Sequence, residues 1–136
     1  MRQSYFELYI HVIWVTKNRE LLINEKTEKS IYTIIKDKCK KFKVDLIAVG
    51  NISDHIHLLI SINPSIKIAE FMAEIKGMTS HFVNHDLKGT LYWQDGYGVL
   101  SISKSGLDFV KKYIENQKEY HNNKKRLVEI LERTEI

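Results

Sequence analysis

The chain has 136 residues, of which 43% are hydrophobic, 28% are charged and a single one is proline. This composition is typical of a globular protein and excludes a disordered or fibrous one, and the length suits one domain over residues 1-136. The formal net charge of +4 favours a polyanionic partner but is too small to establish one.

The sequence predicts a cytoplasmic protein. Cys39 is the only cysteine, which excludes an internal disulfide bond and a cysteine-based zinc site and suits a reducing compartment. The amino terminus lacks the continuous apolar run of a signal peptide. No stretch of the sequence reaches the length of a membrane-spanning helix, so no membrane association is expected.

The first half of the chain predicts a strand, a helix and two further strands. Apolar and polar residues alternate from about Tyr5 to Thr16, as in a half-buried strand, with His11 on its more polar face. An apolar stripe of helical spacing follows from about Asn24, a residue that favours the N-cap position, to Phe42. The segments "VDLIAVGN" and "DHIHLLISI" are then typical of two antiparallel strands joined through a turn between Gly50 and Asp54.

The second half predicts a helix, a strand and a final helix. Pro64-Ser65 marks the start of the second helix, and "LYWQDGYGVLSIS" contains an Asp95-Gly96 turn and the fourth strand. Ser105 and Asp108 fit a capping box for the final helix. This order predicts an α+β, ferredoxin-like fold, in which a four-stranded antiparallel sheet carries two helices on one face and an additional carboxy-terminal helix.

His55 and His57 lie one residue apart in the predicted third strand. Because side chains alternate along a strand, both imidazoles share the face opposite the helix-covered core, which we expect to be open. Two imidazoles at i and i+2 can bind a single cation together. The alternative, which this short motif alone favours, is a pair of exposed histidines on a half-solvated strand.

The final helix supplies two more candidate site residues. In "LDFVKKYIENQKEYHNN", Tyr113 and Gln117 lie one helical turn apart on the same face. Gln117 would complete a three-ligand metal site with the two histidines and leave positions open for a substrate oxygen. Helix periodicity alone favours the alternative in which Tyr113 packs against the sheet and Gln117 is solvated, and Tyr120 is a rival phenol.

These segments together resemble the HUH superfamily, and within it the single-tyrosine transposases of small insertion sequences and the repeat-associated tyrosine transposases. "DHIHLLI" is similar to the histidine-hydrophobic-histidine signature, and "YIENQ" is similar to the tyrosine motif. "HVIWVTKNR", "IKGMTS" and "WQDGYGVLSIS" resemble other family segments, so the likeness covers nearly the whole chain in order. Met78 and His81 depart from it, since they stand where more polar or basic residues are expected.

The resemblance implies a DNA transposase that cleaves and rejoins single-stranded DNA through a 5′-phosphotyrosine intermediate and recognises DNA hairpins at the element ends. His55, His57 and Gln117 would bind a divalent metal, Mg²⁺ or Mn²⁺, and Tyr113 would be the nucleophile. The resemblance also implies a homodimer whose active site is shared between subunits. No small-molecule cofactor is expected, and the sequence has no Gly-rich phosphate loop.

Three cations are candidates for contacts with DNA phosphates. Lys17 and Arg19 lie in the loop after the first strand, and Lys76 lies on the second helix. Trp93 and Tyr97 either stack on unpaired bases or belong to the core.

Two functions of other classes stay open at this point. A non-catalytic nucleic-acid-binding module would use aromatic residues of the open face, such as Tyr5 and Tyr9. A metal-dependent phosphodiesterase would need the histidines but would form no covalent adduct with a tyrosine. Only the transposase accounts for the histidine pair, the spacing of Tyr113 and Gln117, and the other resembling segments together.

Overall fold

The structure is a computed structural model that describes residues 4–123 and 128–135. Its elements are, in chain order, β1 (Leu8–Val15), η1 (Lys17–Arg19), α1 (Glu25–Phe42), β2 (Asp45–Ile52), β3 (His55–Ile62), α2 (Ile68–His81), η2 (Phe82–Asp86), β4 (Gly98–Ile102), η3 (Lys104–Gly106), α3 (Leu107–Glu115), α4 (Gln117–Asn123) and η4 (Glu129–Glu132). The strands form one antiparallel sheet in the order β2-β3-β1-β4. This topology confirms the predicted ferredoxin-like fold.

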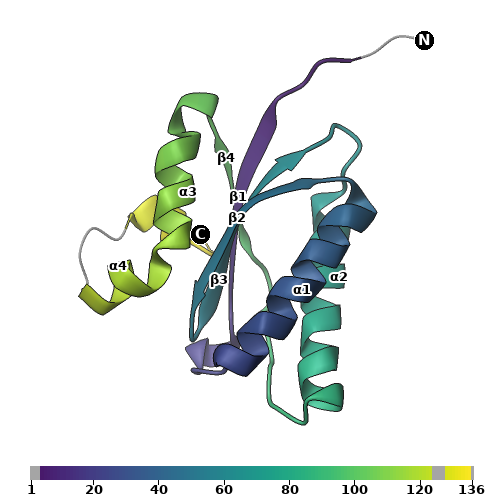
Figure 1. Cartoon of the computed structure of the whole chain (residues 1–136), viewed down its shortest axis with the longest axis vertical. Helices are drawn as coiled ribbons and strands as arrows, with labels where there is room; N and C mark the ends of the chain where they lie inside the picture. Colours follow the sequence, from purple (N-terminus) through teal and green to yellow (C-terminus); the bar gives the residue numbers. More distant parts are fainter. Residues whose placement is uncertain (1–3, 124–127, 136) are drawn as a thin grey trace.

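α1 and α2 cover one face of the sheet and enclose the larger hydrophobic core (Figure 1). The alternation along β3 places Ile56, Leu58 and Ile60 on this face, where all three are buried, as predicted. The side chain of Asn24 accepts a hydrogen bond from the Thr27 N–H at 2.9 Å, which confirms the predicted cap of α1.

The two aromatic residues that were candidates for base stacking also pack against this core. Trp93 and Tyr97 are both partly buried there. The indole N–H of Trp93 donates to Thr79 Oγ1 at 2.9 Å, and its ring lies edge-on to Trp14. Of the two alternatives, the structure therefore supports core packing.

α3 and α4 cover the opposite face of the sheet, which is not open as the sequence had suggested (Figure 1). A second, smaller core forms here from Ala48, Leu59, Val110, Tyr113, Ile114 and Leu131. The amphipathic character of α3 explains this cover, because its buried residues would otherwise face water. The histidine face of β3 is consequently buried.

α3 lies directly on the backbone of β2 at Gly50. A Cβ atom added to Gly50 would lie 1.8 Å from the carbonyl oxygen of Ile114. This is a steric clash with the backbone, and it could be relieved only if backbone atoms moved. Only a residue without a side chain allows this close approach.

We expect Gly50→Ala to lower the free energy of unfolding by about 2 kcal/mol, because α3 would be pushed off the sheet. Urea denaturation measures the change. Gly77→Ala in α2 is the matched control. Apart from neighbouring backbone of α2 itself, no atom of the described residues lies within 4 Å of its added Cβ, so a change of under about 1 kcal/mol, in the stabilising direction, is expected. Equal effects of the two substitutions would contradict this account of Gly50.

Two predicted helix boundaries are wrong. α2 begins at Ile68 and not at Pro64, because the Asn63 side chain accepts a hydrogen bond from the Ser65 N–H at 2.9 Å and stabilises a turn there. The residue that caps the start of the final helical region is Ser103, whose hydroxyl accepts from the Gly106 N–H, and not Ser105.

The final helical region is also divided. It breaks at Asn116 (φ −109°, ψ 27°), so Tyr113 lies on α3 and Gln117 begins α4.

None of the helices among the described residues combines the length and the apolar character that a bilayer crossing requires.

Candidate active site

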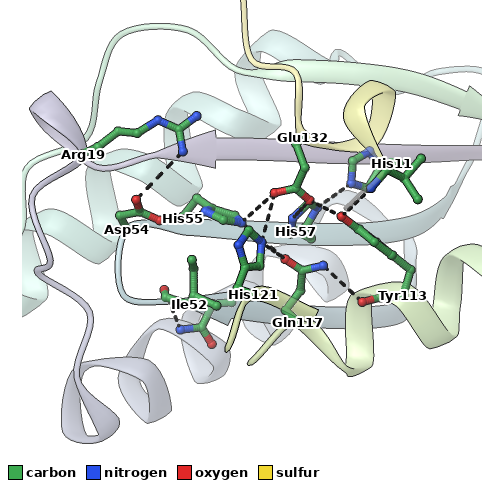
Figure 2. Close-up of polar contacts among 12 residues, drawn as sticks. His11, Arg19, Ile52, Asp54, His55, His57, Tyr113, Gln117, His121 and Glu132 are labelled. Atoms are coloured by element: carbon green, nitrogen blue, oxygen red, sulfur yellow. Dashed lines mark hydrogen bonds and ion pairs between the residues drawn. The ribbon is translucent and has the colours of Figure 1, made fainter. Parts of the chain in front are cut away.

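His55 and His57 point from β3 into the space beneath α3 and α4, where both are buried (Figure 2). Each imidazole has a partner at its Nδ1 atom: Asp54 Oδ1 lies 2.8 Å from that of His55, and Nε2 of His11 on β1 lies 2.7 Å from that of His57. If both Nδ1 atoms carry the proton, both Nε2 lone pairs face the same space. This is the arrangement that a pair of metal-binding histidines needs.

Gln117 and Tyr113 reach the histidines from the same chain. Gln117 Oε1 lies 3.3 Å from His55 Nε2, and its amide N–H donates to the Tyr113 carbonyl at 3.1 Å. The hydrogen bond to the Tyr113 carbonyl orients the Gln117 amide so that its oxygen faces the imidazoles. Tyr113 is buried, and the centroid of its ring lies 5.9 Å from that of His57. The four residues predicted as catalytic or metal-binding therefore lie together (Figure 2).

A carboxylate from the carboxy-terminal segment also enters this space. Glu132 Oε1 lies 3.2 Å from His55 Nε2 and 3.1 Å from Nε2 of His121, a residue of α4. The other oxygen, Oε2, lies 2.9 Å from His57 Nε2 and accepts a hydrogen bond from the Tyr113 hydroxyl at 2.7 Å. Glu132 thus lies between the histidines and the phenol.

A family model described as "Transposase IS200 like" matches residues 4–117, a span that contains the histidine pair, Tyr113 and Gln117. The chain belongs to the IS200-like transposase family. ISDra2 transposase TnpA of Deinococcus radiodurans is 29% identical over 119 residues, which cover 82% of this chain and 85% of that protein. The transposase for insertion sequence element IS200 of Salmonella typhimurium is 25% identical over 118 residues, 79% of this chain and 78% of that protein. The prediction of a DNA transposase is therefore confirmed.

Solved structures agree with this assignment. A crystal structure of a protein assigned as a transposase from Deinococcus radiodurans R1 matches the IS200-like transposase with a TM-score of 0.66 and 27% identity, over 86% of this chain and 95% of that one. A REP-associated tyrosine transposase bound to a REP hairpin has a TM-score of 0.69 over 89% of this chain and 73% of that one, at 14% identity. This second likeness concerns the fold alone.

The charges in the transposase site are strongly coupled. Burial alone would raise the pKa of Glu132, but its contacts with His55 and His57 hold that pKa below its usual range. Burial would lower the pKa of His55, but Asp54 and Glu132 raise it to about 9. Burial prevails at His57 and His11, and it lowers the pKa of His11 to about 3. The two carboxylates therefore favour a positive charge in this site. Without a metal that charge is the proton on His55, and a bound divalent cation would take its place.

The spacing of the donor atoms also fits a single metal ion. Ligands about 2.1 Å from one ion lie about 3.0 Å apart in octahedral and about 3.4 Å apart in tetrahedral geometry. The contacts among these side chains span 2.9 to 3.3 Å, close to these values, and the ligand atoms of the three histidines and Glu132 all lie within 4.8 Å of one another. His57 Nε2 is buried and forms no aligned hydrogen bond with the described part of the chain. A buried imidazole nitrogen of this kind is available as a ligand, so the family and the site are both consistent with a divalent metal.

Tyr113 is held as a neutral phenol. Its hydroxyl accepts a hydrogen bond from the Val128 N–H at 3.2 Å while it donates to Glu132. Burial, followed by the hydrogen bond to Glu132, raises the pKa of Tyr113 well above its ordinary value. The rival phenol, Tyr120, packs with its ring centroid 4.9 Å from that of Tyr113.

The three predicted DNA-binding cations lie in different surroundings. Lys17 and Arg19 are exposed on η1, and Arg19 Nη1 lies 3.9 Å from Asp54 Oδ2, beside the histidine site (Figure 2). The Lys76 ammonium donates to the carbonyls of Gln94 and Gly96 at 2.7 and 3.0 Å, and burial lowers its pKa. Lys76 therefore stabilises the loop before β4. DNA contacts by all three residues stay a prediction.

Four residues that the structure adds to the site were not predicted from the sequence: His11, Asp54, His121 and Glu132. His121 follows Gln117 by one helical turn, so the spacing already used for Tyr113 and Gln117 could have identified it. His11 lay on the correct face of the first strand, but its partner depends on the strand register. No periodicity or motif in the sequence indicates Glu132.

Proposed function

We propose that this transposase cleaves and rejoins single-stranded DNA by transesterification, with Tyr113 as the nucleophile and a 5′-phosphotyrosine intermediate. The observation that carries the proposal is a single carboxylate, Glu132, that contacts the Tyr113 hydroxyl through one oxygen and His55 through the other. A nucleophile this close to a set of metal donors suits metal-assisted phosphoryl transfer. Residues 1-136 would act as one HUH domain.

His55, His57 and Gln117 are the proposed ligands of the catalytic metal. Imidazole nitrogens combined with side-chain oxygens suit Mn²⁺ and tolerate Mg²⁺. When bound, the ion would neutralise charge on the scissile phosphate and so favour attack on phosphorus. Asp54 and His11 would hold the two imidazoles in the tautomer that leaves Nε2 free for the metal.

In the proposed step, the phenolic oxygen of Tyr113 forms a bond to phosphorus while the bond from phosphorus to a 3′ oxygen breaks. The phenol loses its proton and the 3′ oxygen gains one, so the products are a free 3′ hydroxyl and a 5′ phosphate esterified to Tyr113. A 3′ hydroxyl from another strand reverses the exchange and releases the tyrosine. The number of phosphodiester bonds is conserved, so no nucleoside triphosphate is consumed.

The proposed substrate is single-stranded DNA that carries a hairpin. This part of the proposal draws on the REP-associated relative, which is bound to a REP hairpin. Lys17 and Arg19 would contact phosphates beside the site, since both are exposed cations on η1. A homodimer with a shared site would require exchange of α3 and α4 between subunits, because here one chain supplies His55 and Gln117 together.

A covalent-capture assay tests the proposed function. The protein is incubated with single-stranded DNA from both flanks of its gene and with Mn²⁺, and the products are separated on a denaturing gel. We expect a labelled protein–DNA adduct that forms with Mn²⁺ and is absent with EDTA. Cleavage without an adduct would instead identify a phosphodiesterase, and binding without cleavage would identify a non-catalytic module.

His11 provides a separate prediction for the metal site. We expect His11→Ala to weaken Mn²⁺ binding by about 10–100-fold, because His57 would lose the partner that fixes its tautomer and ring orientation. Isothermal titration calorimetry measures the affinity. His81→Ala is the control, since His81 is an exposed residue at the end of α2. An unchanged affinity in His11→Ala would show that His57 is oriented without His11.

A further inference from the structure

We propose that Glu132 and His121 are ligands of the metal ion before DNA binds, and that the Glu132 carboxylate holds the position that a DNA phosphate takes during cleavage. This inference rests on the proposed function and concerns the DNA-free state of the same site. Neither residue belongs to the ligand set that the HUH resemblance implies.

The position of Glu132 relative to the other site residues is the first support. Its two oxygens divide the site: Oε1 faces the Nε2 atoms of His55 and His121, and Oε2 faces His57 Nε2 and the Tyr113 hydroxyl (Figure 2). A scissile phosphate needs the same two contacts, one oxygen on the metal and the phosphorus within reach of the phenol. The carboxylate is therefore an anion with two oxygens in the phosphate's place.

His121 makes the set of donors complete without any substrate. The ligand atoms of His55, His57, His121 and Glu132 all lie within 4.8 Å of one another. Three imidazole nitrogens and one carboxylate oxygen form a four-donor set that suits a first-row transition metal. With these four donors in place, the ion would have no need of a substrate oxygen.

The segment that carries Glu132 packs at a defined position on the protein. We call residues 128–135 the C-terminal strap. Leu131 of the strap is buried in the smaller core, which also contains Leu59. At Gly98 on β4, an added Cβ would lie 2.1 Å from the Arg133 carbonyl oxygen, so the strap backbone lies directly on the strand. The close approach at Gly98 and the burial of Leu131 fix Glu132 from both sides.

Burial gives the third support. The exposed fractions of His57 and Tyr113 are both 0%, so a DNA strand cannot reach either side chain while the strap is seated. Cleavage therefore requires the strap to leave, and a phosphate must replace the carboxylate of Glu132. The Glu132 carboxylate and the DNA phosphate that replaces it are both anions. The exchange therefore keeps a negative charge beside the metal ion.

Cobalt(II) titration of the full chain, followed by visible absorption, tests the inference without any DNA. The cobalt band reports both affinity and coordination number. We expect Glu132→Gln and His121→Ala each to weaken Co²⁺ binding about tenfold or more and to change the band. Glu135→Gln is the matched control, because it removes the same charge from an exposed position of the same strap.

A second variant displaces the strap and keeps the carboxylate. Gly98→Ala should push the Arg133 backbone away and weaken Co²⁺ binding as Glu132→Gln does, although no ligand is altered. Inorganic phosphate serves as the probe of the vacated position. It should change the cobalt band of Glu132→Gln and Gly98→Ala at a lower concentration than it changes the wild-type band.

The outcomes separate this inference from the proposed function. The inference would be overturned if the wild type binds Co²⁺ and its affinity and absorption band stay unchanged in Glu132→Gln, His121→Ala and Gly98→Ala. The proposed metal-dependent transposase would still stand in that case. If the wild type binds no Co²⁺, both fail. Weaker binding in the three variants but not in Glu135→Gln supports the inference, and a lower phosphate requirement supports the substitution of carboxylate by phosphate.

Discussion

Replacing Tyr113 by phenylalanine is expected to reduce the covalent protein–DNA adduct at least about a thousandfold, to an undetectable level. The substitution removes only the hydroxyl, which forms the new bond to phosphorus in the proposed step. The ring stays in the smaller core, where it contacts His57 and Tyr120, so the fold should be retained. The adduct is quantified on a denaturing gel with labelled single-stranded DNA and Mn²⁺.

Tyr120→Phe is the matched control for this experiment, since it removes the phenol of the neighbouring ring. We expect it to form the adduct at close to the wild-type yield. The reverse pattern, with the adduct lost only in Tyr120→Phe, would keep the reaction class but assign the nucleophile to Tyr120. Circular dichroism of both variants, together with Mn²⁺ affinity, shows that a loss of adduct does not reflect a loss of fold or metal.

Replacing His57 by alanine is expected to abolish both Mn²⁺ binding and adduct formation. His57 contributes a buried Nε2 atom that has no aligned hydrogen bond in the described chain, and no other side chain can supply that donor from β3. Mn²⁺ at a hundred times its Kd should stabilise the wild type by about 2.7 kcal/mol. We expect this stabilisation to vanish in His57→Ala, measured as the shift of the Tm on addition of Mn²⁺.

His85→Ala is the control for His57→Ala, because His85 is an exposed histidine of η2. The Mn²⁺-dependent shift of its Tm should equal that of the wild type. The stability of His57→Ala without metal is measured as well, since removal of a buried ring leaves a cavity. A full Mn²⁺ shift in His57→Ala would exclude His57 as a ligand.

The fold was largely predictable because it rests on periodicity. The alternation along β3 correctly separated Ile56 and Leu58 from the two histidines, and the helical stripe with its Asn24 cap correctly gave α1. The boundaries that failed depend on single side-chain hydrogen bonds. Whether Asn63 stabilises a turn, or which serine caps the helix, is decided by local geometry that a pattern of apolar residues does not encode.

The site was predictable only where its residues lie close together in the sequence. His55 and His57 share β3, and Tyr113 and Gln117 are one turn apart in the chain, so spacing alone related the members of each pair. The burial of the histidines could not be predicted in the same way, because it depends on α3 crossing the face that was expected to be open. Glu132 could not be predicted for a similar reason, since the path of the strap depends on its close approach to Gly98 and on the burial of Leu131 in the smaller core.

The distribution of the site along the chain has a consequence for folding. His55 and Gln117 are 62 positions apart, and we expect their contact to close only after the central strands have formed and α4 has reached them. Contacts of such long sequence separation form late, because a large loop-closure entropy must be paid first. A ribosome-bound chain that has released β1 to β4 but not yet the last residues would hold an assembled sheet without a complete set of donors. Metal capture should therefore mark the end of folding, which stopped-flow refolding in the presence of Co²⁺ can time directly.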